Sequence, residues 1–345
     1  MESNIFLTPF LLAFSVAFFL LLTLVRFFQN YQFASTGKRI SLRHIHNVGI
    51  SRFGGVAIIL SFAAALLLDK KLVISSQLLG VLFASVVILI FGILDDLWQL
   101  SWKKQLFFQT GVALFVFLIG IKLEYVTNPL GGIFFLDGGF GSVLNLILVV
   151  SWILLIINAM NWVDGVDGVS GGISAIGALA IFFVSLRPEV NQPPVAIIAA
   201  ALLGSIFAFL VFNFNPAKIL AGTSGSVFMG FILAILALFA GAKIATTLLV
   251  LAVPIIDALW VIKRRFSSRA SVFRADRRHL HYRLLELGWS QRKICLFYLL
   301  ITSLIAIMAL NTRAVGKAII FFTVIVSMLF VYIFVDKKGQ SNSNQ

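Results

Sequence analysis

Four polar side chains stand at three-residue spacing directly after an apolar run. Asn158 and Asn161 fall on one helix face, because residues three apart on a helix are neighbours. Asp164 and Asp167 are each followed by a glycine, and this Asp-Gly-x-Asp-Gly pattern predicts a turn beyond the helix. Carboxylate and amide oxygens bind hard cations and polar ligands. Residues 158–172 therefore predict a binding site, with a plain turn as the alternative.

Further titratable side chains lie at the end of apolar runs, inside them, or in basic segments of the chain. Asp95 and Asp96 close an apolar run, and Asp257 lies inside another run. The remaining ones stand in basic segments: His44, His46, Asp276, His279 and His281. Each motif alone has a plain explanation, such as a polar helix terminus, a solvated histidine or a buried carboxylate that backbone groups satisfy. Their expected convergence on one face of the protein is what predicts an active site.

The chain that must position these residues reads as a polytopic membrane protein. Of its 345 residues, 60% are hydrophobic and 12% are charged, whereas soluble domains carry about 25% charged residues. A helix needs about 20 apolar residues to cross a bilayer. We therefore predict an all-α fold in one integral membrane domain, residues 1–345, with about eleven transmembrane helices. The predicted spans are 5–27, 52–68, 74–94, 105–121, 142–160, 170–187, 194–212, 224–241, 243–262, 294–311 and 315–335.

Basic residues set the predicted orientation. The net charge is +14, and in a membrane protein cytoplasmic loops and anionic lipid explain this excess better than nucleic acid does. Most lysines and arginines fall on one side of the predicted topology, ten of them from Lys263 to Lys293. We place this side, the motifs above and the C-terminus in the cytoplasm, and the N-terminus outside. The first span ends at Arg26 without a small-residue cleavage site, so we expect it to be retained.

One loop on the opposite side has a pattern of its own. Residues 122–140 contain two short apolar runs around the sequence Asn-Pro-Leu-Gly-Gly. Proline and glycine between two apolar runs are typical of a turn between short strands. This loop therefore predicts a small β-hairpin on the external face.

The residue types gathered on the cytoplasmic face suit phosphoryl transfer from a charged soluble donor to a membrane-bound acceptor. Two phosphate-bearing substrates need positive charge, from Mg²⁺ or from arginine and lysine. Aspartates serve as metal ligands or as a base. The loop 213–226 also fits this chemistry, because backbone N–H groups at the start of the eighth span can hold an anion. Those N–H groups belong to Gly222, Ser224, Gly225 and Ser226.

Six motifs occur in the order found in the polyprenyl-phosphate N-acetylhexosamine-1-phosphate transferases (glycosyltransferase family 4), which the chain resembles from about residue 43 to residue 283. The family includes enzymes that start teichoic acid, O-antigen and enterobacterial common antigen synthesis, and the phospho-MurNAc-pentapeptide translocase. Any one motif alone is weak, but together they are specific. They are Arg52-Phe-Gly-Gly55, Gly92-Ile-Leu-Asp-Asp96 with Lys103 and Gln109, Asn158 to Gly172, Asn213 to Gly230, Pro254 to Asp257, and His279-Leu-His281.

The resemblance implies a reaction in a bacterial inner membrane. A UDP-N-acetylhexosamine, with N-acetylglucosamine the expected sugar, reacts with undecaprenyl phosphate and releases UMP. The cofactor is Mg²⁺, with Mn²⁺ as a substitute. A homodimer is left open, and no nucleic acid is expected.

The resemblance also implies roles for individual residues. Asp95 and Asp96 match the catalytic aspartate pair, one of which is the family's proposed base for the lipid phosphate. Asn161 and Asp95 are the expected metal ligands, together with the position of Thr223. The expected substrate-binding residues are Lys103, Asn158, Asp164, Asp167, Asn213, Arg278, His279, His281 and Arg283.

Two positions depart from the family pattern. Before the eighth span the family usually reads Gly-Asp-x-Gly-Ser, and here Thr223 replaces that metal-binding aspartate. A neutral hydroxyl is a poorer ligand for Mg²⁺, so the departure puts metal use in question. The histidine motif ends in Tyr282 where a further histidine is common, which favours a simple UDP-N-acetylhexosamine over UDP-MurNAc-pentapeptide as donor.

Two other functions compete with an active transferase. The first is a binding protein on the same scaffold, which holds a UDP-sugar or a lipid phosphate without turnover because Thr223 has replaced the aspartate. The second is a transporter of a polar solute, whose charged side chains would line a path to both faces of the membrane. The acidic motifs gather on one face apart from Asp257, so the transporter ranks last.

Overall fold

The computed structural model describes residues 4–30, 50–123, 125–127, 132–136, 138–239, 244–267 and 278–343. His44, His46, Asp276 and the turn expected near residues 241–243 lie outside this part of the chain. The described helices are α1 (Asn4–Asn30), α2 (Gly54–Leu68), α3 (Ser76–Trp98), α4 (Trp102–Leu118), α5 (Gly138–Val163), α6 (Val169–Ser185), α7 (Pro193–Asn213), α8 (Gly222–Leu238), α9 (Ile244–Val250), α10 (Ala252–Ser267), α11 (Leu280–Glu286), α12 (Gln291–Leu310) and α13 (Ala314–Ser343).

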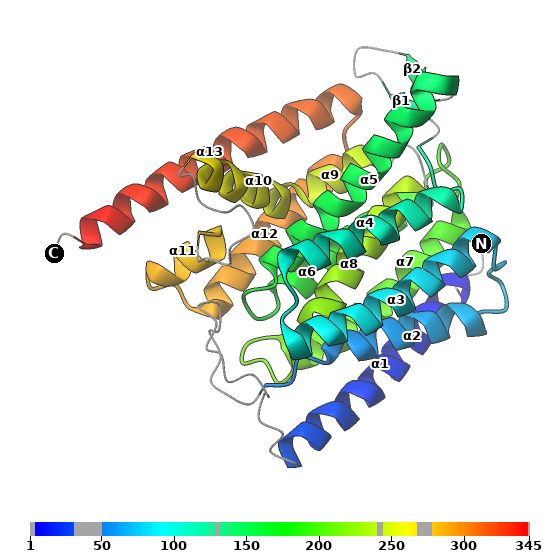
Figure 1. The fold of residues 1–345 in the computed structure, drawn as a ribbon, viewed down its shortest axis with the longest axis horizontal. Coiled ribbons are helices and arrows are strands. Elements are labelled where there is room, and N and C mark those ends of the chain that lie inside the picture. The colour runs from blue at the N-terminus through cyan, green and yellow to red at the C-terminus, as the bar shows by residue number, and fades with distance from the viewer. Residues whose placement is uncertain are drawn as a thin grey trace.

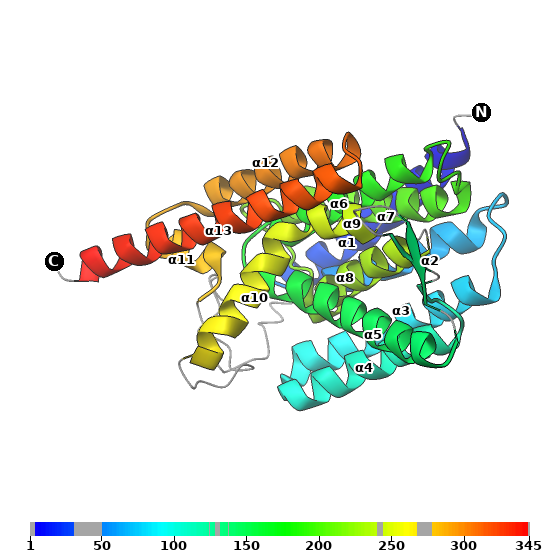
Figure 2. The ribbon, with the colours of Figure 1, turned by 90° about the horizontal axis from the view of Figure 1, so that it is seen from above.

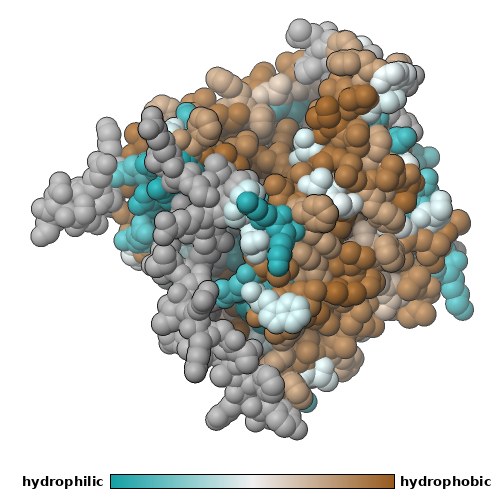
Figure 3. All heavy atoms as spheres, viewed as in Figure 1, coloured by the Kyte–Doolittle hydropathy of each residue, from teal (hydrophilic) through white to brown (hydrophobic). Residues whose placement is uncertain are grey.

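The helices confirm an all-α polytopic membrane protein. Six of them, α1, α3, α5, α7, α12 and α13, are long and apolar enough to cross a membrane by themselves, and α9 with α10 would make a seventh. The helices α2, α6 and α8 are apolar but shorter, at 15 to 17 residues. Figure 3 shows a broad apolar surface over the area that α3, α4 and α5 occupy in Figure 1.

The ninth predicted span is wrong as a single helix. Residues 243–262 were expected to cross without interruption, but α9 and α10 meet at a bend of 72°. Pro254 explains the position of the break, because a proline ring has no N–H and clashes with the carbonyl four residues earlier. That carbonyl belongs to Val250, the last residue of α9. In Figure 2, α10 consequently departs from the direction of α9, and it packs against α5 and α13.

The core of the bundle is formed by α7 and α8. Nearly every residue of both helices is buried. α8 packs against α2, α3, α5 and α6, whereas α7 packs against α1, α2 and α6. The described chain begins and ends at opposite ends of the molecule in both views (Figures 1 and 2). Because α3 and α5 both pack against α8, the polar motifs at the ends of these three helices are held by one of the most buried helices of the fold.

The predicted hairpin is present between α4 and α5. Strand β1 (Tyr125–Thr127) pairs antiparallel with β2 (Ile133–Phe135), with Val126 opposite Phe134. Buried Asn145 in α5 fixes the start of the hairpin, since its side chain accepts from the backbone N–H of Leu123 at 3.1 Å and donates to the Leu123 carbonyl at 2.6 Å. Residues 128–131, where the turn was predicted, lie outside the described chain.

Two glycines allow α2 and α3 to approach the first turn of α8. A Cβ atom on Gly92 would lie 2.3 Å from the Cα atom of Ser224 and 2.4 Å from its nitrogen. A Cβ atom on Gly55 would lie 2.3 Å from the nitrogen of Gly225. These obstacles are backbone atoms, so a side chain at either position would push the helices apart. The close approach brings the end of α3 to the start of α8.

We expect Gly92→Ala to destabilise the protein by about 1–3 kcal/mol, because the added methyl group overpacks the contact between α3 and α8. Gly111→Ala in α4 is the matched control. It adds the same methyl group where no atom lies within 4 Å and should leave stability unchanged or slightly raised. Thermal unfolding of the purified proteins measures the difference. Equal melting temperatures for the two variants would contradict this packing account.

Candidate active site

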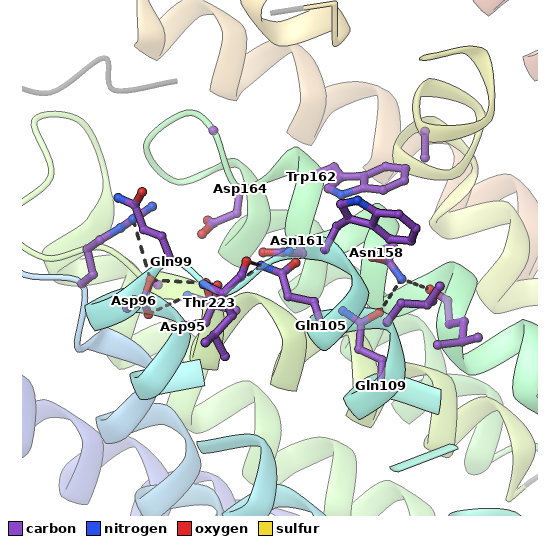
Figure 4. Close-up of a pocket in the computed structure, with 18 of the residues that line it drawn as sticks. Asp95, Asp96, Gln99, Gln105, Gln109, Asn158, Asn161, Trp162, Asp164 and Thr223 are labelled. Atoms are coloured by element: carbon purple, nitrogen blue, oxygen red, sulfur yellow. Dashed lines mark hydrogen bonds and ion pairs between the residues drawn. The ribbon is translucent and has the colours of Figure 1, made fainter. Parts of the chain in front are cut away.

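A polar cleft of about 670 Å³ opens between the ends of α3, α4, α5, α8 and α10. Its size falls in the range usual for sites that bind small molecules. Figure 4 shows Asp95, Asp96 and Thr223 on one side, Asn158 and Gln109 on the other, and Asn161 and Gln105 between them. Eight residues expected at the site line this cleft: Asp95, Asp96, Asn158, Asn161, Asp164, Asp167, Asn213 and Thr223.

Thr223 joins the two aspartates at the N-terminus of α8. Its backbone N–H donates to Asp96 Oδ2 at 2.8 Å. Its hydroxyl lies 2.8 Å from Asp95 Oδ2 and 3.3 Å from Asp96 Oδ1. The N-terminus of a helix favours negative charge, because its first N–H groups have no partner within the helix. In the structure the start of this helix meets the protein's own carboxylate pair through Thr223, which was not among the N–H donors predicted to hold an anion.

Arg52 supplies positive charge to the same pair. Its guanidinium lies 3.7 Å from Asp96 Oδ1. The segment that carries Arg52 is held beside the residues before α8, since Leu220 N–H donates to the Ser51 carbonyl at 2.8 Å and Gly54 N–H donates to the Leu220 carbonyl at 3.0 Å. Gly222 is required at this crossing, because it has a φ of 68° and its Cβ would lie 2.1 Å from the Arg52 carbonyl oxygen.

The second oxygen of Asp95 fixes the loop between α3 and α4. Asp95 Oδ1 accepts from Leu100 N–H at 3.0 Å and from the side-chain amide of Gln105 at 2.8 Å. α3 ends at Trp98, and the next residue, Gln99, is a non-glycine residue with a φ of 49° whose N–H donates to the Asp95 carbonyl. Asp95 is buried, with 8% of its surface exposed, so these donors offset the loss of hydration of its carboxylate.

The two asparagines of α5 occupy different parts of the cleft wall. Asn161 Oδ1 accepts from the Ser226 hydroxyl at 2.9 Å, which ties α5 to the first turn of α8. The side-chain amide of Asn158 donates to Gln109 Oε1 at 2.8 Å, which ties α5 to α4. Their three-residue spacing was expected to place them on one helix face, and both do line the cleft.

The loop between α5 and α6 is fixed by its own aspartates. Asp164 accepts a short hydrogen bond from the Ser170 hydroxyl in the first turn of α6. Asp167 Oδ2 accepts from Ala217 N–H at 3.0 Å and from the Asn215 side chain. Asn213 accepts from Gly168 N–H at 3.0 Å and donates to a carbonyl of its own loop. Asp167 and Asn213 therefore hold two loops together while they line the cleft.

The histidine motif lies behind the cleft wall. His279 Nδ1 is 2.8 Å from Asp257 Oδ2, and Asp257 Oδ1 also accepts from Leu280 N–H at 2.8 Å. His281 packs against Gly165, where an added Cβ atom would lie 2.3 Å from its ring nitrogen. Both histidines are buried, with at most 1% of their surface exposed. Tyr282, the departure from the family pattern, is the member of this segment that lines the cleft.

The last helix holds this segment in place. The Tyr332 hydroxyl of α13 makes a short hydrogen bond to Asp257 Oδ1. Asp336, one turn later, lies 2.8 Å from the guanidinium of Arg264 in α10 and 3.8 Å from that of Arg283 in α11. α13 therefore connects α10 and α11 through two residues: Tyr332, which bonds to the buried Asp257, and the partly exposed Asp336.

Some expected site residues lie away from the cleft. Among the described residues, its walls exclude five of the predicted substrate-binding positions: Lys103, Arg278, His279, His281 and Arg283. Lys103 instead lies on a groove on the opposite side of α4. Arg283 is paired with Glu286 and Asp336 on the surface of α11.

Comparison with known proteins places the chain in a family. Residues 78–241 match the model of glycosyl transferase family 4. The chain is 30% identical over 309 residues to the probable undecaprenyl-phosphate N-acetylglucosaminyl 1-phosphate transferase of Bacillus subtilis, covering 88% of this chain and 84% of that protein. This chain belongs to glycosyl transferase family 4. It is accordingly a phosphosugar transferase, as its motifs predicted.

Two further relatives show the breadth of the family. The decaprenyl-phosphate N-acetylglucosaminephosphotransferase of Mycobacterium leprae is 34% identical, covering 78% of this chain and 75% of that protein. The phospho-N-acetylmuramoyl-pentapeptide-transferase of Halalkalibacterium halodurans is 28% identical, covering 90% of this chain and 98% of that protein. The family segment 78–241 contains the cleft residues of α3, α4, α5 and α8.

The carboxylate and amide oxygens of the cleft would be the groups to hold a divalent cation together with substrate oxygens. Within the described chain, no group of three histidine, cysteine, aspartate or glutamate side chains could enclose a metal ion. Mg²⁺ is commonly held by one or two carboxylates together with substrate phosphates. Asp95 and Asp96 would provide these one or two carboxylates. Asn161, which carries an amide oxygen, lines the same cleft.

Several cleft residues were not predicted as site residues. Gln105 stands four residues before Gln109, a member of the second motif, so the two share a helix face, and this spacing could have identified Gln105. Arg265 is buried in the cleft wall, although its sequence Lys-Arg-Arg resembles an ordinary basic anchor. Its burial there depends on the bend between α9 and α10, which the uninterrupted apolar run did not predict.

We expect Tyr332→Phe to destabilise the protein by about 1.5–3 kcal/mol, because the variant removes a buried hydrogen bond to a carboxylate. Amide hydrogen exchange in residues 280–286 should also rise, since Asp257 holds the start of α11. Thr323→Val is the control, as it removes a hydroxyl of the same helix that bonds only to the carbonyl of Ile319. Unchanged melting and exchange in Tyr332→Phe would show that α13 does not hold this segment.

Proposed function

We propose that the protein transfers N-acetylglucosamine-1-phosphate from UDP-N-acetylglucosamine to undecaprenyl phosphate and releases UMP, as the first membrane step of cell-envelope glycan synthesis. The observation that carries this proposal is the carboxylate pair Asp95 and Asp96, fixed by Thr223 at the edge of a cleft that also has apolar and basic walls. The named activities of the Bacillus and Mycobacterium relatives support the choice of sugar and of a polyprenyl phosphate.

The walls of the cleft differ in a way that suits the two substrates. Side chains of α4, α5 and α10 form an apolar wall: Leu106, Leu154, Leu155, Ala258 and Ile262. An isoprenoid chain fits such a wall, because apolar side chains can replace the van der Waals contacts that the chain makes with lipid tails. The same cleft is also lined by Asp164, Arg265 and Tyr282, which suit the polar sugar nucleotide. Arginine in particular binds phosphate oxygens through two parallel N–H groups.

The reaction forms one phosphorus–oxygen bond and breaks another. An oxygen of the lipid phosphate attacks the β-phosphorus of the UDP-sugar. The bond between that phosphorus and the oxygen bridging to the α-phosphate breaks, and UMP leaves with the bridging oxygen. One carboxylate of the pair Asp95 and Asp96 accepts the proton of the lipid phosphate, and the pair orients that phosphate toward the donor. Arg52, beside Asp96, offsets part of the negative charge that both substrates bring.

Mg²⁺ is the proposed cofactor, held by Asp95, Asp96 and Asn161. When bound, it would neutralise phosphate oxygens and stabilise the leaving UMP. Thr223 adds no negative charge where the family usually has an aspartate, so substrate phosphates must complete more of the coordination. We further propose that the cleft faces the cytoplasm of the inner membrane, which the basic segments around it support.

We expect Asp95→Asn and Asp96→Asn each to lower UMP release by about 100-fold or more, because each removes a carboxylate that serves as the base or as a metal ligand while preserving shape. The assay uses the purified protein with undecaprenyl phosphate and UDP-N-acetylglucosamine, and mass spectrometry identifies the lipid product. Glu189→Gln is the matched control, since it neutralises a carboxylate outside the cleft. Full activity in both aspartate variants would contradict the assignment of the pair.

The same assay separates turnover from mere binding. Removing divalent cations with EDTA should abolish UMP release, and added Mg²⁺ should restore it. The binding-protein alternative rests on Thr223. It would be favoured if the wild-type protein bound UDP-N-acetylglucosamine but released no UMP with any UDP-N-acetylhexosamine, with or without Mg²⁺.

A further inference from the structure

A second cavity lies on the opposite side of α4 from the cleft. It is a groove of about 830 Å³ between α3 and α4, and it shares only Leu100 with the cleft among their described lining residues. α4 divides its side chains between the two cavities. Gln105 and Gln109 face the cleft, whereas Lys103, Phe107 and Gly111 face the groove. The groove is therefore a separate site rather than an extension of the reaction cleft.

The walls of the groove are apolar and partly rigid. Phe91 of α3 stacks on Phe108 of α4 with ring centres 3.7 Å apart, and Phe83 contacts Phe115 with centres 5.6 Å apart. Phe107 is 84% exposed along the edge. Gly111 leaves open space, since no atom lies within 4 Å of the position of its missing side chain. These features make a surface that hydrocarbon chains can fill.

The charged end of the groove is basic. Lys103 and Lys104 lie at the start of α4, at the end of the molecule that holds the cleft, and both are exposed. No acidic side chain lines the groove among the described residues. Trp102 lies beside Lys103, whose ammonium is 5.8 Å from the centre of the indole ring. Tryptophan and lysine at the end of a membrane helix are typical of the level of lipid headgroups.

We infer that this groove binds an anionic phospholipid. The two ammonium groups contact the phosphate headgroup, and the acyl chains lie along the phenylalanine wall. Bulk anionic lipid is favoured over the acceptor lipid for two reasons. Lys103 and Lys104 line the groove and not the cleft that holds Asp95 and Asp96, and the cleft has apolar lining of its own for the acceptor. The resemblance implied a phosphate near Lys103, and in this assignment that phosphate belongs to a structural lipid.

The test is retention of phosphatidylglycerol by the purified full-length protein, followed by native mass spectrometry during exchange against phosphatidylcholine. The wild-type protein should retain phosphatidylglycerol preferentially. The double variant Lys103→Gln/Lys104→Gln should weaken that retention by about tenfold or more, because each lysine near an anionic headgroup contributes separately. Gly111→Leu should weaken it as well by filling the groove, and its melting curve checks that the fold is intact.

Matched variants at the other end of the molecule serve as controls. Lys70→Gln/Lys71→Gln removes an exposed pair of lysines, and Gly139→Leu fills another open glycine position. Both should retain phosphatidylglycerol as the wild type does. Equal retention in the groove variants and the wild type would overturn the proposal. So would displacement of phosphatidylglycerol by undecaprenyl phosphate from the wild type but not from Gly111→Leu, which would assign the groove to the acceptor. Because no step requires turnover, these results are independent of the proposed reaction.

Discussion

Two carboxylates stand side by side in a largely apolar protein, and the rest of the site depends on how the protein holds them. Asp95 and Asp96 repel one another, and burial removes most of the water that would stabilise them. Thr223 compensates with a backbone N–H and a hydroxyl aimed at both. Because these groups belong to the first turn of α8, the most buried helix supports the most polar contact.

The fold around this contact follows from the need to bring distant segments close together. Gly55 and Gly92 let α2 and α3 reach the backbone of α8, and Gly222 lets the chain pass Arg52. Asn161 and Ser226 add α5 to the same place. The bend before Pro254 then turns α10 toward the cleft, and α13 secures the segment behind it. Each of these elements thus either places a side chain in the cleft or allows a neighbouring helix to approach closely enough to do so.

The helices, the hairpin and several site residues could be predicted from the sequence, because each depends on a short local pattern. Apolar runs predicted the helices, and the proline and glycine turn predicted the hairpin. The site residues of α3 and α5 were identified because helix ends with acidic and amide groups are unusual in a membrane protein, whereas Thr223 of α8 was identified only through the family resemblance. The partner of Asp95 could not be found in this way, since Thr223 is 128 positions away and its approach depends on helix packing. The burial of His279 and His281 likewise depends on Asp257 and on α13.

The central claim is that the Thr223 hydroxyl holds the carboxylate pair in its working arrangement. The direct measurement is UMP release by Thr223→Val and Thr223→Ser at saturating substrates. Valine has the same shape without the hydroxyl, so we expect kcat to fall by about 10- to 100-fold. Serine keeps the hydroxyl and should remain within about threefold of the wild type. Wild-type turnover in Thr223→Val, with unchanged melting temperature, would show that the pair does not depend on this contact.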